Sequence, residues 1–98
     1  MMIISRIHRR GGERLLAACD AELLGTTLAE GEIKLVVSEK FYSGETITEE
    51  VFAERMGSVT IMNLIGDRVV DIAIEKGYVS PENVMIIAGV KHAQAVIL

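Results

Sequence analysis

The alternation of hydrophobic and polar positions near the start of the chain predicts a β-hairpin. Two segments rich in apolar residues, 2–10 and 13–19, flank the pair Gly11-Gly12. Two adjacent glycines supply the positive φ angles that a tight two-residue turn requires. This turn pairs Arg10 with Glu13 and places Ile7 opposite Leu16. Opposite charges then meet near the turn and apolar side chains meet further along, which stabilises this register.

The next part of the chain is expected to contribute one strand between polar connections. The expected elements are a short helical turn over residues 21–24 that Asp20 caps, a connector over 26–32, a strand over 33–37 and a surface loop over 39–46. Ile33, Leu35 and Val37 alternate with Lys34, Val36 and Ser38, a spacing typical of a strand, with Lys34 outward near its start.

The second half of the chain predicts helices and strands in alternation. The expected elements are a helix over residues 49–56 with Thr48 as N-cap, a buried strand over 59–65, a helix over 67–76 that Asp67 caps and Gly77 ends, and a strand over 84–88. Strand, helix and strand in this order form a βαβ unit with parallel strands. The sequence therefore predicts an α+β fold in a single domain over residues 1–98. Its mixed sheet has about five strands, an N-terminal hairpin and a C-terminal βαβ unit, with helices packed on the sheet.

The charge of the chain is unevenly distributed. The net charge is −4, and a protein that binds nucleic-acid phosphates over much of its surface normally carries the opposite sign. A local basic cluster around the Gly11-Gly12 turn is the exception, and it consists of Arg6, His8, Arg9, Arg10 and Arg14. Two interpretations stay open, a solvated hairpin tip and a contact with a small anion or an RNA backbone.

The cysteine content and the apolar segments indicate a cytoplasmic protein. Cys19 is the only cysteine, so no internal disulfide is possible. The first residues do not form the apolar core of a signal peptide, and the apolar stretches are far shorter than the ~20 residues that span a bilayer. We therefore expect no contact with a membrane.

The residue types that carry catalysis are sparse. His8, Cys19 and His92 lack the spacing of metal ligands, so we expect neither a metal site nor a cofactor. Cys19 follows an apolar run, where a free cysteine is usually a small buried hydrophobic residue rather than a nucleophile. We therefore expect a function other than catalysis, although a small enzyme stays open.

Two segments of the second half are candidate ligand sites. Asn63 and Gly66 lie where a strand turns into a helix, a place where phosphates often bind. The loop has a single glycine and Asp67 stands where an anion would approach, so the favoured interpretation is a tight turn at Gly66 with Asp67 as the helix cap. Lys91, His92 and Gln94 follow the last predicted strand, at the end where ligands bind in α/β sheets. The second segment has two interpretations that stay open. One is a ligand site. The other is an exposed polar tail before the apolar residues 95–98, which add an edge strand or dock on a partner subunit.

Several motifs together resemble an archaeal family of proteins of unknown function, number 424 in its series. The residues that carry the resemblance are Gly11 to Asp20, Glu22 to Gly25, Asn63 to Gly66, the helix that ends at Gly77, Pro81 to Val84 and Gly89 to Gln94. The resemblance covers nearly the whole chain and implies an archaeal, cytoplasmic setting. It assigns no activity to any residue. Lys91 departs from the family pattern, which has proline at that position.

The leading hypothesis is a non-catalytic binding or adaptor module whose partner is a protein or a structured RNA, with the translation apparatus as a candidate setting. The basic hairpin tip and the segment from His92 to Gln94 would form its contact surfaces. One alternative is a small enzyme or ligand-binding protein with a pocket around Asn63, His92 and Gln94. A second alternative is a structural homodimer formed through residues 95–98.

Overall fold

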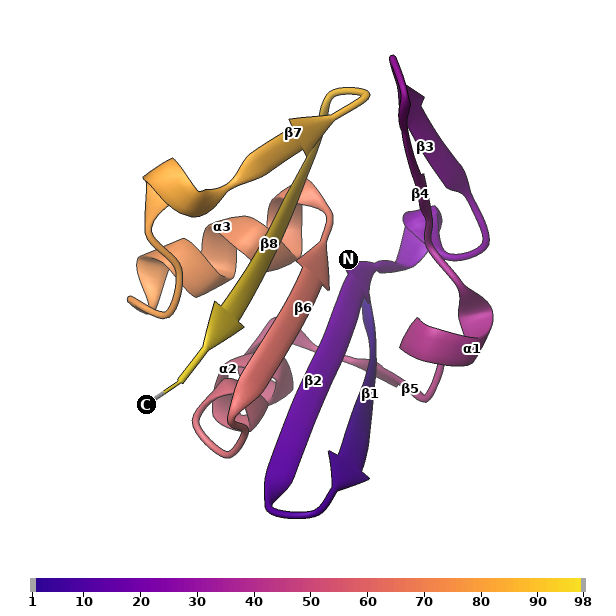
Figure 1. Ribbon diagram of the computed structural model, residues 1–98. Coiled ribbons are helices and arrows are strands. Elements are labelled where there is room, and N and C mark those ends of the chain that lie inside the picture. The colour runs from indigo at the N-terminus through magenta and orange to yellow at the C-terminus, as the bar shows by residue number, and fades with distance from the viewer. Residues whose placement is uncertain (1, 98) are drawn as a thin grey trace.

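A mixed sheet of six strands forms the centre of the computed structural model, which describes residues 2–97 (Figure 1). The strands occur in the order β5 (Glu45–Ile47), β1 (Ile3–Arg10), β2 (Glu13–Asp20), β6 (Ile61–Ile65), β8 (Val90–Val96) and β7 (Met85–Ile87). Strands β2 and β6 are parallel, and the other neighbours are antiparallel. The expected α+β fold with a mixed sheet is confirmed.

The N-terminal hairpin has the predicted register. Its pairs run from Ile3 opposite Asp20 to Arg10 opposite Glu13. Gly11 adopts a φ of +59° in the turn, a value that glycine reaches without the steric cost of a Cβ atom. The turn chemistry at one end of the hairpin therefore fixes the pairing over the whole length of both strands.

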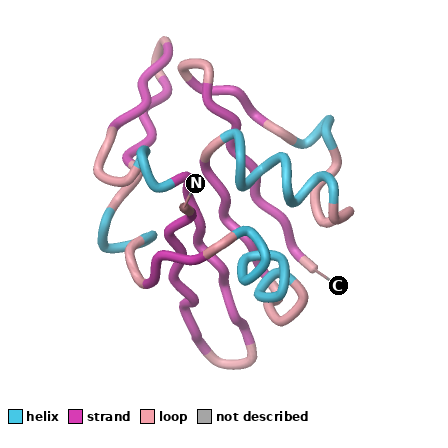
Figure 2. The backbone as a smooth tube through the Cα atoms, turned by 180° about the vertical axis from the view of Figure 1, so that it is seen from behind, coloured by secondary structure: helices cyan, strands magenta, loops and turns pink. Residues whose placement is uncertain are grey.

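Two helices cover one face of the sheet. Helix α2 (Glu49–Met56) and helix α3 (Asp67–Glu75) lie behind the sheet in Figure 1 and in front of it in Figure 2. As predicted, Thr48 is the N-cap of α2, and its hydroxyl accepts a hydrogen bond of 3.2 Å from the N–H of Val51. The main core forms between these helices and the sheet, where its fully buried side chains include Phe52, Met56, Val69, Val70, Leu16, Met62 and Leu64.

The opposite face of the sheet is covered only in part. A separate hairpin of β3 (Thr27–Glu30) and β4 (Ile33–Val36), followed by helix α1 (Glu39–Tyr42), lies over one end of that face. A second core forms beneath them from Ala17, Cys19, Leu28, Val37, Tyr42, Ile65 and Ile87. The Glu30 carboxylate also accepts a hydrogen bond of 2.7 Å from the N–H of Ala88, which ties this hairpin to the β7–β8 turn.

This half of the chain corrects three expectations. Residues 26–32 are not only a connector, because they contain β3 and a tight turn in which Gly31 has a φ of +60°. The strand over 33–37 pairs with β3 and does not join the main sheet. The expected surface loop over 39–46 contains α1 and β5, because Tyr42 is buried against the sheet and anchors a helix of only four residues.

The C-terminal segment is a strand and not a tail. Ala88 and Gly89 both have positive φ, 51° and 79°, so the chain reverses in a tight turn and β8 returns between β6 and β7. Because β6 and β7 are each antiparallel to β8, they run in the same direction, as the βαβ unit predicts. The added element is β8. Gly89 marks its turn in the sequence but Ala88 does not, because alanine rarely adopts positive φ.

Asp20 caps α3 rather than the turn that follows it. That turn is a 3-10 helix over Ala21–Leu23, to which the Asp20 side chain contributes no capping bond. The carboxylate instead accepts hydrogen bonds of 3.1 and 3.0 Å from the N–H groups of Arg68 and Val69. Asp67 was predicted as this cap, but it is the first helical residue, and its carboxylate accepts from the N–H of Lys91 at 3.0 Å.

The Asp20 carboxylate packs directly against Gly66. Asp20 is only 5% exposed, and burial raises the pKa of its carboxyl while the two backbone donors and Arg68 act in the opposite direction. Gly66 has a φ of +125°, and a Cβ atom there would lie 2.4 Å from Cγ of Asp20. Only glycine fits this junction of β6 with α3.

Replacing Asp20 with alanine tests this capping role. Asp20→Ala leaves two N–H groups of α3 without their acceptor, and we expect the free energy of unfolding in urea to fall by about 2–3 kcal/mol. Glu22→Ala is the matched control, because Glu22 is exposed and its loss should change stability by less than ~0.5 kcal/mol. Equal stability of the two variants would contradict the assignment.

A pair of glycine substitutions separates steric contact from backbone strain. Gly66 and Gly77 both have positive φ, but a Cβ atom at Gly77 would meet nothing within 4 Å. We expect Gly77→Ala to lower the free energy of unfolding by about 1–2 kcal/mol through strain alone. Gly66→Ala should cost at least ~2 kcal/mol more, because the new methyl group collides with Asp20. Thermal melts showing equal losses would contradict the close packing at Gly66.

Candidate functional site

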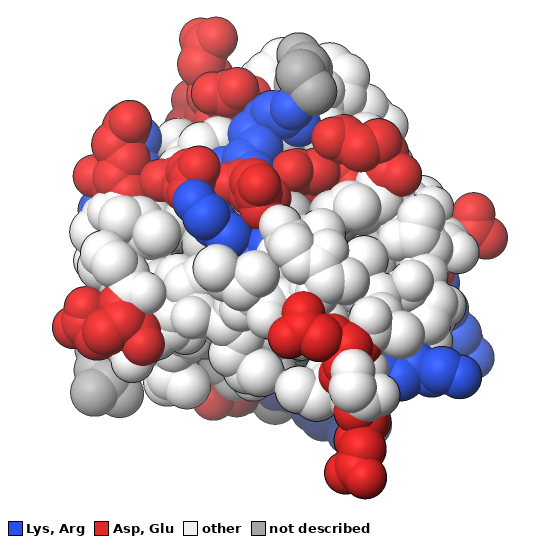
Figure 3. Space-filling view, turned by 90° about the horizontal axis from the view of Figure 1, so that it is seen from above, with Lys and Arg blue, Asp and Glu red and all other residues white. Residues whose placement is uncertain are grey.

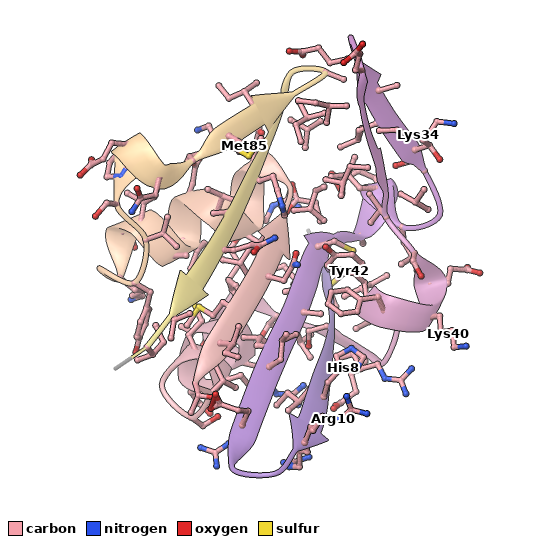
Figure 4. The ribbon with its side chains drawn as sticks, viewed as in Figure 1. His8, Arg10, Lys34, Lys40, Tyr42 and Met85 are labelled. Atoms are coloured by element: carbon pink, nitrogen blue, oxygen red, sulfur yellow. The ribbon has the colours of Figure 1, made fainter. Side chains whose placement is uncertain are left out.

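The face of the sheet opposite α2 and α3 carries side chains in regular rows. We call the part that α1 and the β3–β4 hairpin leave uncovered the open face. One row across the strands, the polar row, consists of Arg6, Ala17, Asn63 and Gln94, of which Ala17 is buried in the second core. The next row toward the β1–β2 turn, the apolar row, consists of His8, Leu15, Ile61 and Val96. Figure 4 is viewed onto this face.

A groove lies at the hairpin end of the open face. Its volume is about 520 Å³, and it is lined by His8, Arg9, Arg10, Glu13, Leu15, Phe41 and Ile61. We call it the hairpin groove. Leu15 and Ile61 are half-buried and occupy neighbouring positions of β2 and β6, so they form an apolar floor. The groove therefore combines apolar and aromatic surface with two arginines.

The aromatic wall of the groove is a stacked pair. The rings of His8 and Phe41 lie 4.9 Å apart between centroids, with an angle of 20° between their planes. His8 Nε2–H donates a hydrogen bond of 2.7 Å to the Phe41 carbonyl. This contact joins α1 to β1 and holds the Phe41 ring beside the sheet, so that the wall is ordered before any ligand binds.

The predicted basic cluster is divided between the groove and its surroundings. Arg9 and Arg10 line the hairpin groove, and Figure 4 shows Arg10 near the end of β1, below His8. Arg6 donates from Nη1 to the Lys40 carbonyl at 3.1 Å. Arg14 extends elsewhere, because its Nε donates at 2.6 Å to the Ser58 carbonyl, to which its Nη2 also donates.

The basic surface continues around the edge of the sheet. A second hollow of about 500 Å³ is lined by Ser5, Arg6, Ile7, Arg9, Gly44, Glu45, Arg55 and Ser58. Arg9 borders both hollows. Within the second hollow, Arg55 forms an ion pair of 3.1 Å with Glu45. Glu45 therefore balances part of the charge of Arg55. Arg9 is the arginine that both hollows share.

Asn63 is oriented by a buried tyrosine. The Tyr42 hydroxyl donates a hydrogen bond of 2.7 Å to Oδ1 of Asn63. Burial raises the pKa of Tyr42 to about 12, so the hydroxyl stays protonated and acts as a donor throughout the physiological range. Because Oδ1 of Asn63 accepts from Tyr42, its amide group offers N–H donors to a ligand. Gln94 stands directly opposite Asn63 and is exposed.

The other predicted binding residues do not present free polar groups beside this pair, although His92 lies in the next row of the same face, opposite Ile65. His92 is 7% exposed, and its Nδ1–H donates at 2.8 Å to the Leu64 carbonyl. Lys91 forms an ion pair of 2.7 Å with Asp71 of α3, on the opposite face of the sheet. Gly66 packs against Asp20. Of the predicted set, Asn63 and Gln94 are therefore the two that stand directly opposite each other on this face, and His92 beside them is buried.

Sequence reasoning missed Phe41 and Tyr42 as parts of the site, because it assigned them to a surface loop. One local signal was present. Ser38 precedes Glu39 as an N-cap does, and its hydroxyl accepts a hydrogen bond of 3.2 Å from the N–H of Phe41. The position of α1 over the sheet is a tertiary feature that this signal does not contain.

The two ends of the molecule differ in charge. Four of the ten Arg and Lys residues lie between positions 6 and 14, together with one of the fourteen Asp and Glu residues. Figure 3 views the end that carries the β3–β4 turn and shows several groups of Asp and Glu side chains there, with fewer Lys and Arg side chains among them. Glu30 and Glu32 belong to that turn. The β3–β4 turn and the β1–β2 turn lie at opposite ends of the molecule (Figure 1), so the acidic end is remote from the hairpin groove.

Cys19 lies in the second core and is fully buried. Burial, with the nearby carboxylates of Asp20 and Glu22, raises the pKa of its thiol to about 12. Within residues 2–97, no group of three or more His, Cys, Asp or Glu side chains is arranged to hold a metal ion. Over the same residues, no helix has the length and apolar character needed to cross a bilayer.

The chemistry of Cys19 gives a direct test. Because the thiolate is the reactive species, we expect native protein to react with a disulfide reagent at pH 8 far more slowly than protein unfolded in urea. Ser43→Cys in a Cys19→Ala background is the control, because Ser43 is exposed. Labelling of native Cys19 at the rate of this control would show that the thiol is accessible.

Comparisons with known proteins place the chain in a family. A crystal structure of an uncharacterized conserved protein from the archaeon Methanopyrus kandleri matches it with a TM-score of 0.86 and 27% sequence identity. The match covers 100% of this chain and 93% of that protein. A comparison with curated proteins finds no match. The model of a family described as "Protein of unknown function (DUF424)" matches residues 8–98, and the chain therefore belongs to that family.

Proposed function

We propose that this protein is a non-catalytic RNA-binding module, and that RNA binds at the hairpin groove and the basic surface around it. The observation that supports this most strongly is the combination of Arg9 and Arg10 with an apolar floor and the stacked Phe41 ring in one groove. Arginine binds phosphate through paired N–H donors, and bases pack on aromatic and apolar surfaces.

The uneven charge supports binding at one end only. The acidic remainder of the chain repels a polyanion, so attraction is confined to the hairpin end. This is compatible with the net charge of −4, which disfavours binding over the whole surface. An RNA would therefore approach in one orientation, with its backbone near Arg9 and Arg10.

The apolar lining favours RNA over a small inorganic anion. A bare phosphate gains nothing from Leu15, Ile61 and Phe41, whereas a nucleotide presents both a charged group and a flat ring. Structured RNAs with loops, such as those of the translation apparatus, offer such nucleotides without the cost of opening a helix. We take the protein partner and the small-ligand pocket around Asn63 as the alternatives that the experiment must separate.

A non-catalytic role is supported by the state of the candidate nucleophile and bases. Cys19 is buried with a raised pKa. His8 and His92 each donate a ring N–H to a backbone carbonyl, that of Phe41 and that of Leu64. These bonds engage both rings in structural contacts within the fold.

Charge reversal at the groove tests the proposal. We expect Arg9→Glu with Arg10→Glu to weaken binding of an archaeal RNA fragment at least about tenfold at ~50 mM salt. The logarithm of the binding constant falls linearly with the logarithm of the salt concentration. The magnitude of this slope should decrease by about 0.7 for each phosphate that the variant no longer binds. Fluorescence anisotropy with labelled RNA measures both quantities.

The matched control changes the same amount of charge elsewhere. Lys34→Glu with Lys76→Glu alters two exposed lysines, and Figure 4 shows Lys34 on the β3–β4 hairpin, away from Arg10. This variant should lose less than about threefold in affinity. Equal losses of RNA affinity in the two double variants would mean that only the net charge matters, and would contradict binding at the hairpin groove. Wild-type protein that binds no RNA would refute the proposal as a whole.

A further inference from the structure

The hairpin groove and the polar row lie next to each other along the same strand. Ile61 forms part of the groove floor, and Asn63 follows it two positions later on the same face of β6. Residues so spaced on a strand are about 6.6 Å apart. A ring that lies over Ile61 beside Phe41 therefore has its far edge within reach of the Asn63 amide.

The Asn63 amide has a fixed chemical character toward a ligand. Its oxygen accepts the hydrogen bond of the buried Tyr42 hydroxyl, so the amide N–H groups are the part that is offered to a base. Donors require an acceptor on the base edge. Uracil, cytosine and guanine each carry a ring carbonyl oxygen that accepts from such donors. Adenine also has acceptors, N1 and N7, but both flank an amino group, and the Asn63 oxygen that would accept from this amino group is already bonded to Tyr42.

The rim of the groove supplies the contacts that a nucleotide backbone needs. Arg9 and Arg10 line the groove, and Lys40 lies beside Phe41 on α1. A base that is stacked within an A-form helix does not reach a concave site of this kind, because its faces are covered by its neighbours and its edges are paired. A base in a loop or at a strand end presents a free face and a free edge.

We infer that the hairpin groove holds one unpaired base of the RNA, packed against Phe41 and over Leu15 and Ile61, with a carbonyl oxygen of the base accepting from Asn63. This inference rests on the proposed function and defines the class of RNA that the site accepts. The ligand is a single-stranded or looped segment, and adenine is the base that fits least well.

Affinity for single-stranded and duplex RNA tests the first part. Fluorescence anisotropy compares a labelled oligouridine of about eight nucleotides with a duplex of equal length. The single strand should bind at least about tenfold more tightly, because one unpaired base adds stacking to the phosphate contacts. Phe41→Ala should reduce this advantage at least about fivefold and leave duplex binding unchanged, whereas Phe41→Tyr should retain it.

The base preference tests the second part with an isosteric pair of variants. Wild-type protein should bind oligouridine about fivefold more tightly than oligoadenosine, the difference made by one hydrogen bond. Asn63→Asp keeps an acceptor for Tyr42 and removes the donors, so this preference should disappear. Gln94→Glu adds the same charge directly opposite and should weaken both oligonucleotides equally while the preference persists.

The outcomes separate the inference from the proposed function. Binding of neither RNA form at ~50 mM salt overturns the proposed function and this inference together. Equal affinity of the wild-type protein for single strand and duplex overturns the inference and leaves RNA binding in place. The same holds if the Phe41→Ala variant keeps the wild-type melting temperature and the full preference for the single strand. Equal affinity for oligouridine and oligoadenosine in the wild-type protein overturns the role of Asn63.

Discussion

The parallel pairing of β2 with β6 is the contact on which the rest of the structure depends. Forty residues separate the two strands, so no local turn fixes their register. Hydrogen bonds fix the pairing of the two strands at both of its ends. At one end the buried Asp20 carboxylate of β2 binds the first N–H groups of α3, the helix that follows β6. At the other end Arg14 and Thr60 exchange hydrogen bonds of 2.9 Å.

This register decides what the open face presents. A shift of β6 by one residue would turn Ile61 and Asn63 toward α2 and α3 and bring Met62 and Leu64 to the surface. The polar row and the floor of the hairpin groove would both disappear. The capping bond at Asp20 therefore contributes to the binding surface although it lies at the other end of the strands, because it holds the strand pair that carries that surface.

Sequence reasoning succeeded where the signal is local and failed where the contact is tertiary. Gly11-Gly12 specified the first hairpin, and Thr48 marked the start of α2. The turn before β8 was missed, because Ala88 adopts a positive φ that alanine rarely takes. In the candidate site the basic cluster was visible in the sequence. The contribution of Tyr42 was not, because its partner Asn63 lies twenty-one positions away.

The most direct measurement of the central claim is a titration of ¹⁵N-labelled protein with single-stranded RNA, followed by NMR. Binding at the hairpin groove predicts shifts in the backbone amides of Arg10, Leu15 and Ile61 and in the side-chain amide of Asn63. The amides of α3, which lie on the covered face, should stay unchanged. Shifts confined to α3 or to the edge strand β7, with the groove unaffected, would contradict the account.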